Sequence, residues 1–399
     1  MTERLKGNAV IGQSGGPTCV INQSLVGAIQ ESANYPEIEH FYGALNGLKG
    51  ILNENFIDLK KEDPASLETI AATPSAALGS VRMKPTEDDC RKVFEIFKKH
   101  DIRYFFYIGG NDSAETASIV NNLADEADYD FNVFHIPKTI DNDLLVTDHC
   151  PGFGSAAKFV ACALMGDNLD NRALPGIKID IIMGRHAGFL TAASVLGRKY
   201  EDDGPHLVYL PERPFDLDQF TADVTGIYNR LGRCLIAVSE GVADKDGNPV
   251  FTTGEKDSHG NVQLSGSGGL GDFLMNHLKS KIDGARVRSD TFGYLQRSFP
   301  GVLSETDAAE ARLAGRMAVK YAVENCTDGS VALKRTGNGD NYGCETIIAE
   351  LNSVAKHTKG VPDEFINAEG NNVTDAFVEY AKPLAGTLPE VGRLEAIKV

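Results

Sequence analysis

Two hydrophobic periods alternate along most of the chain, and this alternation restricts the possible fold more than any other feature of the sequence. Short runs rich in β-branched and aromatic residues are separated by longer stretches with helical spacing of apolar residues. Such alternation predicts mainly parallel sheets covered by helices on both faces. The predicted strands are Ala9–Gly12, Arg103–Ile108, Phe131–Ile136, Ile177–Met183, Leu207–Leu210 and Cys234–Val238, and the predicted helices are 18–33, 86–100, 113–124, 153–171, 187–199, 216–231 and 305–325.

A chain of 399 residues is long enough for two ordinary domains. We therefore expect an α/β fold of two Rossmann-like, three-layer lobes with mainly parallel sheets. Candidate site residues are spread along much of the chain, so the active site is expected between the lobes. We assign residues 1–150, with returning C-terminal segments, to the first lobe and residues 151–330 to the second. Residues 331–399 are expected to form strands and helices that pack across both lobes.

Charge and apolar content exclude several classes of protein. The formal net charge is −17, so we expect no binding to nucleic acid or to an anionic membrane surface. No apolar run reaches the roughly 18 residues of a membrane span, and residues 1–7 lack the apolar segment of a secretory signal, so a cytoplasmic location is predicted. The seven cysteines are scattered without a CxxC pair, which indicates neither a zinc site nor a disulfide framework.

Several predicted strands end in a polar turn that opens the next helix, and ligands of α/β sheets bind at such ends. Gly109-Gly110-Asn111-Asp112-Ser113 allows a phosphate to approach a helix N-terminus, although a tight turn capped by Ser113 or Asp112 would give the same pattern. Pro137-Lys138-Thr139-Ile140-Asp141-Asn142-Asp143 combines a lysine, a hydroxyl group and two carboxylates. This combination favours phosphoryl transfer to an alcohol over a simple Asx-rich turn.

Further segments carry groups suited to anions or sugars. Arg185, in Met183-Gly184-Arg185-His186, follows a strand and could stabilise phosphate charge, with a surface arginine as the alternative; we assign a structural role to His186. Glu240, in Ser239-Glu240-Gly241, could accept hydrogen bonds from sugar hydroxyls or cap a turn. Gly79-Ser80-Val81-Arg82 by itself favours an ordinary loop.

A cluster of arginines stands out in so acidic a chain. Its charge favours an anionic ligand, since arginine binds phosphate through two parallel hydrogen bonds, and a solvated basic face is the alternative. The cluster consists of Arg286, Arg288, Tyr294, Gln296 and Arg297.

Taken together and in this order, these segments resemble the phosphofructokinase family. The resemblance extends from about Val10 to about Lys320, and it covers weakly both the later residues and the segment 241–268. We interpret 241–268 as a polar hairpin excursion with turns at Asp244–Pro249 and His259–Asn261, followed by the Gly-rich stretch Ser265–Gly271. The resemblance rests on Ser14-Gly15-Gly16, Gly109-Gly110-x-x-Ser113, Thr139-Ile140-Asp141-Asn142-Asp143, Met183-Gly184-Arg185 and Gln296-Arg297.

The resemblance implies Mg²⁺-dependent phosphorylation of fructose 6-phosphate at its 1-hydroxyl, in glycolysis or gluconeogenesis. Asp141 would be the base that accepts the hydroxyl proton, with Thr139 and Lys138 beside it, Arg185 would stabilise the transferring group, and Asp143 would organise the site. The sugar phosphate would be bound in the second lobe by Thr139, Asp141, Met183, Gly184, Arg185, Glu240, Arg288, Tyr294 and Arg297, with Arg288 and Arg297 on its phosphate group. The donor would be bound in the first lobe by Gly15, Gly16, Arg82, Gly110, Asp112 and Lys138.

Two positions indicate which donor is used. ATP-using members of the family resemble Gly-Gly-Asp-Gly-Ser and Pro-Gly-Thr-Ile-Asp-Asn-Asp, whereas this chain has Asp112 and Lys138 at the variable positions. A carboxylate at position 112 opposes the α-phosphate of a nucleotide, and Lys138 adds a point charge for a compact pyrophosphate. The sequence therefore predicts reversible transfer from pyrophosphate, yielding fructose 1,6-bisphosphate and phosphate.

Asn111 departs from the family, which usually has an aspartate linked to Mg²⁺ there. Asp112 would then bind the metal, or the neutral oxygen of Asn111 would do so directly or through water. An ATP-dependent enzyme and a non-catalytic sugar-phosphate-binding protein remain alternatives, whereas a Rossmann oxidoreductase is disfavoured because no segment fits the G-x-G-x-x-G context.

Regulation and assembly are predicted from the same resemblance. No arginine or lysine occurs in residues 22–30, so we expect no strong nucleotide allostery. A homodimer or homotetramer is expected, in which Arg288 could act on a neighbouring subunit. The sequence does not distinguish a dimer from a tetramer. It also does not indicate the direction of the reaction in the cell or whether sedoheptulose 7-phosphate is used.

Overall fold

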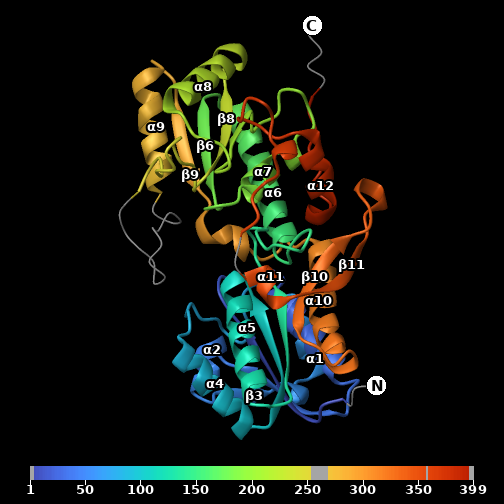
Figure 1. Cartoon of the computed structure of the whole chain (residues 1–399). Coiled ribbons are helices and arrows are strands. Elements are labelled where there is room, and N and C mark those ends of the chain that lie inside the picture. Colours follow the sequence, from blue (N-terminus) through green and yellow to red (C-terminus); the bar gives the residue numbers. More distant parts are fainter. Residues whose placement is uncertain (1–3, 253–267, 356–357, 395–399) are drawn as a thin grey trace.

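Strands of almost continuous apolar sequence form two sheets, one in each of two lobes (Figure 1). The computed structural model describes residues 4–252, 268–355 and 358–394. The strand Tyr104-Phe105-Phe106-Tyr107 illustrates the local reason, because successive side chains point to opposite faces and every one of them is buried. Such a strand is stable only with helices on both faces, which is the arrangement observed.

The first sheet has the strand order β11-β10-β5-β4-β1-β2-β3. Neighbouring strands from β10 to β2 run parallel, and β11 and β3 pair antiparallel at the two edges. The C-terminal strands β10 and β11 thus extend a sheet that the N-terminal part of the chain begins. The strands are β1 (Gly7–Gln13), β2 (Ile38–Ala44), β3 (Phe56–Asp58), β4 (Ile102–Gly109), β5 (Asn132–Pro137), β10 (Gly329–Arg335) and β11 (Cys344–Ala349).

Helices cover both faces of this first sheet. One face packs against α1 (Ile21–Ser32), α3 (Pro64–Ala71) and α10 (Glu305–Glu324). The other packs against α2 (Gly47–Leu52), α4 (Glu87–Lys99), α5 (Asn111–Glu126) and α11 (Leu351–Ala355). α4 shows how the sequence sets an element: Thr86 and Asp89 form a capping box, and its buried residues fall on one side.

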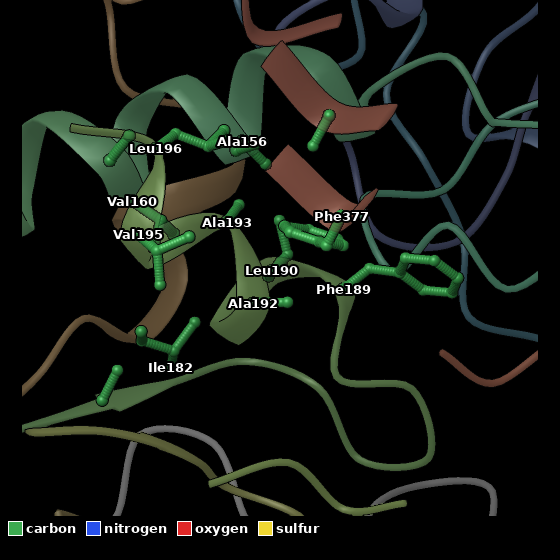
Figure 2. Packing of buried hydrophobic residues seen from close by; sticks show 14 of the residues in the cluster. Ala156, Val160, Ile182, Phe189, Leu190, Ala192, Ala193, Val195, Leu196 and Phe377 are labelled. Carbon is green, nitrogen blue, oxygen red and sulfur yellow. The ribbon is translucent and has the colours of Figure 1, made fainter. Parts of the chain in front are cut away.

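The second sheet is entirely parallel, in the order β7-β8-β6-β9. Its strands are β6 (Ile177–Ile182), β7 (Leu207–Tyr209), β8 (Cys234–Ser239) and β9 (Val287–Thr291). One face packs against α8 (Leu217–Leu231) and α9 (Gly269–Lys281). The other packs against α6 (Phe153–Ala173), α7 (Phe189–Ala192) and α12 (Asp375–Ala385); Figure 2 shows Phe189, Leu190 and Phe377 within this core.

The two-lobe α/β fold is confirmed, as are all the predicted strands and all the predicted helices except one. Residues 187–199 were expected to form a single helix, and that prediction is wrong. The segment is the four-residue α7 followed by a 3-10 helix, Ala193–Gly197. Core residues of β6, α6 and α12 surround it, so packing rather than helical periodicity decides its backbone (Figure 2).

The turn predicted at Asp244–Pro249 is confirmed, since Ala243 pairs with Pro249 and the Gly247 N–H donates to the Asp244 carbonyl at 3.0 Å. The turn predicted at His259–Asn261 lies outside the described residues, as does most of Ser265–Gly271. None of the helices in the described ranges is long and apolar enough to cross a membrane. Further 3-10 turns lie at Leu59–Lys61, Gly293–Arg297, Gly339–Asn341 and Asp363–Phe365.

Candidate functional site

A cavity of about 430 Å³ lies where the strand ends of the two lobes face each other. Its wall combines turns that follow β1, β4 and β5 of the first sheet with turns that follow β6 and β8 of the second. The lining residues are Ser14, Gly15, Gly16, Pro17, Val81, Arg82, Met83, Gly110, Asn111, Asp112, Ser113, Lys138, Thr139, Ile140, Asp141, Asp143, Met183, Arg185, His186, Glu240, Tyr294 and Arg297.

Positive charge gathers around the Gly15-Gly16 turn. The ammonium group of Lys138 donates to the Gly16 carbonyl at 2.7 Å. A Cβ atom on Gly16 would lie only 2.7 Å from Nη1 of Arg297, and Gly15 has φ of +76°. The positive φ of Gly15 therefore favours glycine there, and a side chain on Gly16 would have to displace the guanidinium of Arg297. Arg82 also lines this part of the cavity. The pKa of Arg297 is lowered mainly by burial and next by the positive charge of Arg82.

Lys138 is the buried cation of the site, with only 5% of its surface exposed. Burial lowers its pKa to about 8, and the positive charge of Arg297 is the next cause. The Lys138 N–H donates to the Gly109 carbonyl at 3.0 Å, which ties the residue to the end of β4. Like charges held together at a cost in free energy favour the binding of a multiply charged anion.

The loop after β5, which begins with Lys138, also carries the carboxylates of Asp141 and Asp143. Burial raises the pKa of Asp141, and the negative charges of Asp143 and Glu240 raise it further. Burial also raises the pKa of Asp143, although a hydrogen bond from Thr139 partly offsets this. Raised pKa values of this kind suit a group that accepts a proton near neutral pH.

Hydrogen bonds fix the backbone around this loop. Oγ1 of Thr139 accepts from the Asp141 N–H at 3.1 Å, and the Thr139 N–H donates to the Pro151 carbonyl at 3.2 Å. Asn142, between the two aspartates, is fully buried. The tight local geometry therefore holds the carboxylates at the cavity wall.

The first turn of α5 brings side-chain oxygens to the cavity wall. Asp112 is exposed at the N-terminus of this helix, after the Gly110 cap. The side-chain oxygen of Asn111 is buried and has no hydrogen-bond partner. A buried amide oxygen without a donor is costly unless a ligand satisfies it.

The second lobe contributes residues after β6 and β8 and from the 3-10 turn Gly293–Arg297. Gln296 is buried and links these parts, since its Oε1 accepts from the Met183 N–H at 3.2 Å and its Nε2 donates to the Gly293 carbonyl at 2.8 Å. The guanidinium of Arg297 lies 4.5 Å over the ring of Tyr294. Gln296 thus sets the position of Arg297 relative to Met183.

Most site residues predicted from the sequence line this cavity, but two do not. Gly184 lies just behind the wall, where its carbonyl accepts from the Ser239 hydroxyl at 2.5 Å. Arg288 lies on the edge strand β9, exposed, and its Nη1 donates to the Val287 carbonyl at 3.0 Å. Within one chain the structure does not bring Arg288 to the cavity. Arg286 is likewise exposed and donates to the Leu174 carbonyl at 3.2 Å.

Some lining residues were not predicted as functional. Ser14, Pro17, Ser113 and Ile140 adjoin predicted residues, so their place at strand ends was the available signal. His186 lines the cavity too, and burial lowers its pKa. Its position next to Arg185 was the signal for it, although the sequence favoured a structural role.

Known proteins resemble this chain over nearly its whole length. The sequence matches the family Phosphofructokinase over residues 8–322. It is 53% identical over 399 residues to a pyrophosphate–fructose 6-phosphate 1-phosphotransferase of Rhodospirillum rubrum, covering 99% of this chain and 98% of that protein. A protein of the same name from Xanthomonas campestris pv. campestris is 39% identical over 388 residues, covering 95% and 91%. The crystal structure of a pyrophosphate-dependent phosphofructokinase from Nitrosospira multiformis matches with a TM-score of 0.85 at 33% identity, covering 98% of this chain and 95% of that chain.

Proposed function

The chain belongs to the phosphofructokinase family, and on this premise we propose that it is a phosphotransferase that moves a phosphoryl group from pyrophosphate to the 1-hydroxyl of fructose 6-phosphate. The bond between the transferred phosphorus and the leaving phosphate breaks while a bond to the sugar oxygen forms. The hydroxyl proton passes to the protein, and the products are fructose 1,6-bisphosphate and phosphate. The reaction should be readily reversible, because cleaving pyrophosphate releases less free energy than using ATP would.

The observation that carries the choice of donor is the buried ammonium of Lys138 beside the Gly16 carbonyl, in a cavity that Asp112 also lines. A buried cation suits a short, highly charged anion. The carboxylate of Asp112 would repel the additional phosphate of a nucleotide and so provide discrimination against it.

The residues divide the work as follows in our proposal. Asp141 accepts the proton from the sugar hydroxyl, with Thr139 beside it. Arg185 and Lys138 stabilise the charge on the transferring group. Arg82, Gly15, Gly16, Gly110 and Asp112 bind pyrophosphate, and Met183, Gly184, Glu240, Tyr294 and Arg297 bind the sugar phosphate.

Mg²⁺ is the cofactor that the family implies, and the residues present fit it. Asp112 offers a hard oxygen ligand, and the unpaired side-chain oxygen of Asn111 offers a neutral one. In the described part of the chain, no three ligand atoms from Asp, Glu, His or Cys of this cavity lie within 4.8 Å of one another. This suits Mg²⁺, which usually takes one or two carboxylates and completes its shell with water and substrate phosphate. The bound ion would neutralise charge on the donor.

Assembly into a homo-oligomer is also proposed. The edge strand β9 carries the exposed Arg288, and Tyr294, Leu295 and Phe299 nearby in sequence expose 45%, 60% and 40% of their surface. Apolar side chains beside an open sheet edge favour contact with a second copy. Arg288 would then reach the sugar phosphate of the neighbouring subunit. We propose the cytoplasm as the location, because none of the seven cysteines, all of which lie within the described residues, forms a disulfide, and this suits a reducing compartment.

The proposal is tested by initial rates with purified protein, fructose 6-phosphate and Mg²⁺, with pyrophosphate in one series and ATP in another. Turnover with pyrophosphate and not with ATP is expected. Replacing both discriminating residues, Asp112→Gly with Lys138→Gly, should raise the ratio of ATP to pyrophosphate use at least about tenfold. Asp218→Gly is the matched control, because Asp218 is an exposed aspartate in the first turn of α8, away from the cavity. A preference of the unmodified protein for ATP would refute the donor assignment, and no turnover with either donor would favour the non-catalytic alternative.

A further inference from the structure

The side chain of Asn142, between Asp141 and Asp143, is held by hydrogen bonds at both polar atoms of its amide group. Asn142 is fully buried and has φ of +58°, a left-handed conformation that asparagine tolerates better than most residues. Its Oδ1 accepts from the Cys150 N–H at 2.9 Å, and its Nδ2 donates to the Tyr380 hydroxyl at 2.7 Å. The backbone that carries both carboxylates therefore depends on these two bonds.

Tyr380 connects the two ends of the same loop. Its hydroxyl accepts from Asn142 and donates to the Asp148 carbonyl at 2.9 Å. Tyr380 belongs to α12, so residues separated by more than 230 positions meet here. Removing this one oxygen would release the loop at Asn142 and at Asp148 together.

The ring of Tyr380 is itself held in place. The rings of Phe153, Phe189 and Phe365 lie 6.5, 6.2 and 5.3 Å from it, centroid to centroid. The guanidinium of Arg335 lies 4.8 Å from the centroid of the Tyr380 ring, and it donates to the Tyr380 carbonyl at 2.9 Å. The hydroxyl group is therefore presented from a rigid support, which is what positioning a loop requires.

A second connection comes from the same C-terminal part of the chain. The Lys359 N–H donates to the Asp143 carbonyl at 2.7 Å, and its ammonium donates to the carbonyls of Thr147 and Asp148, each at 3.0 Å. Lys359 and Tyr380 both lie beyond residues 8–322, the part that matches the family. Support of the loop thus comes from outside the matched region.

We propose that Tyr380 is a positioning residue for the reaction: through Asn142 it holds the Asp141 and Asp143 carboxylates in the geometry that phosphoryl transfer needs. The inference rests on the proposed function, in which Asp141 is the base. Tyr380 does not line the cavity, so it acts on the loop rather than on a substrate. Displacement of a reacting group by a fraction of an ångström lowers the rate of the chemical step more than it weakens binding.

The test is Tyr380→Phe, which keeps the ring packing and removes only the hydroxyl group. We expect kcat to fall between about 5-fold and 50-fold, while KM for fructose 6-phosphate and for pyrophosphate changes less than about twofold. Tyr104→Phe is the matched control: the Tyr104 hydroxyl donates to the Leu5 carbonyl at 2.7 Å, at the far end of β4.

Each outcome decides the matter. If Tyr380→Phe keeps kcat within twofold of the unmodified protein, or if Tyr104→Phe lowers kcat as much as Tyr380→Phe does, the positioning role is refuted. A rise in KM for one substrate alone, with kcat unchanged, would also overturn it, since that would indicate direct contact with that substrate. Failure of the proposed function is distinguishable, because the unmodified protein would then show no turnover with pyrophosphate at all, and both proposals would be withdrawn.

Discussion

Replacing Lys138 with methionine should make the protein more stable and far less active. Burial lowers the pKa of this lysine from 10.5 to about 8. Since one pKa unit corresponds to about 1.4 kcal/mol, holding the charged ammonium in the ligand-free protein costs about 3 kcal/mol. Methionine has a similar length and no charge, so this cost is removed. It cannot make the hydrogen bond to the Gly16 carbonyl, and the loss of that bond cancels about 1 kcal/mol of the gain in stability. We therefore expect the free energy of unfolding at pH 7 to rise by about 1 to 2 kcal/mol.

The pH dependence of this gain has a definite sign. The pKa of Lys138 is lower in the folded protein, so the cost is fully present below about pH 8, where both states are protonated. It disappears as the pH rises from about 8 towards 10.5, the value in the unfolded chain. The difference in thermal midpoint between Lys138→Met and the unmodified protein should be a few degrees at pH 7 and smaller at pH 9.5.

Activity should change in the opposite direction. The ammonium that is costly in the empty cavity is the group that meets pyrophosphate, so kcat/KM for pyrophosphate should fall about 10²- to 10³-fold in Lys138→Met. In the unmodified protein, KM for pyrophosphate should rise as the pH passes about 8, and the variant should lack this rise. Steady-state rates from pH 6.5 to 9.5 and thermal unfolding over the same range measure both effects.

Lys158→Met is the control for this experiment. Lys158 is partly buried on α6 and donates to the Leu303 carbonyl at 3.0 Å, away from the cavity. Its replacement should leave kcat/KM within about twofold. If Lys138→Met instead lowers the thermal midpoint and loses activity only in proportion, Lys138 serves the fold rather than the donor, and the argument from its buried charge is refuted.

Two further substitutions test the base and the neighbouring subunit. Asp141→Asn should lower kcat about 10³-fold and change the affinity for fructose 6-phosphate, measured by calorimetry, by no more than a few-fold. It should also raise the thermal midpoint, because burial disfavours the charged carboxylate. A kcat within tenfold of the unmodified value would exclude Asp141 as the base. If Arg288 acts on a neighbouring subunit, subunit exchange between Asp141→Asn and Arg288→Ala at low fructose 6-phosphate should restore about a quarter of the activity, since one site of each mixed dimer is then intact. No recovery, with mixed dimers present, would place Arg288 in the site of its own chain.

Local sequence determined the elements and most of the candidate site. Apolar runs such as Tyr104–Tyr107 form strands because every side chain is buried on one face or the other. Gly110, Lys138, Arg185 and Glu240 follow directly after strands, so parallel topology alone brings them to facing sheet ends. These relations span only a few residues each and are visible in the order of residue types.

Other features depended on contacts between distant segments. The bounds of the strands β9, β10 and β11 were not predicted, because these strands are partly polar and are defined by the strands they pair with. The segment 187–199 departs from a single helix because the surrounding core sets its backbone. Each choice was made by packing energy that no local pattern records.

The support of the loop at Asn142 shows the same division. Local sequence places Asp141 and Asp143 after β5, and the left-handed φ of Asn142 is within the range of that residue type. Only the tertiary structure brings the Tyr380 hydroxyl within 2.7 Å of Asn142, because that contact depends on how α12 packs against α6 and the rings around it. The sequence thus determined which groups are present at the strand ends, and the packing of the two lobes decided which of them meet.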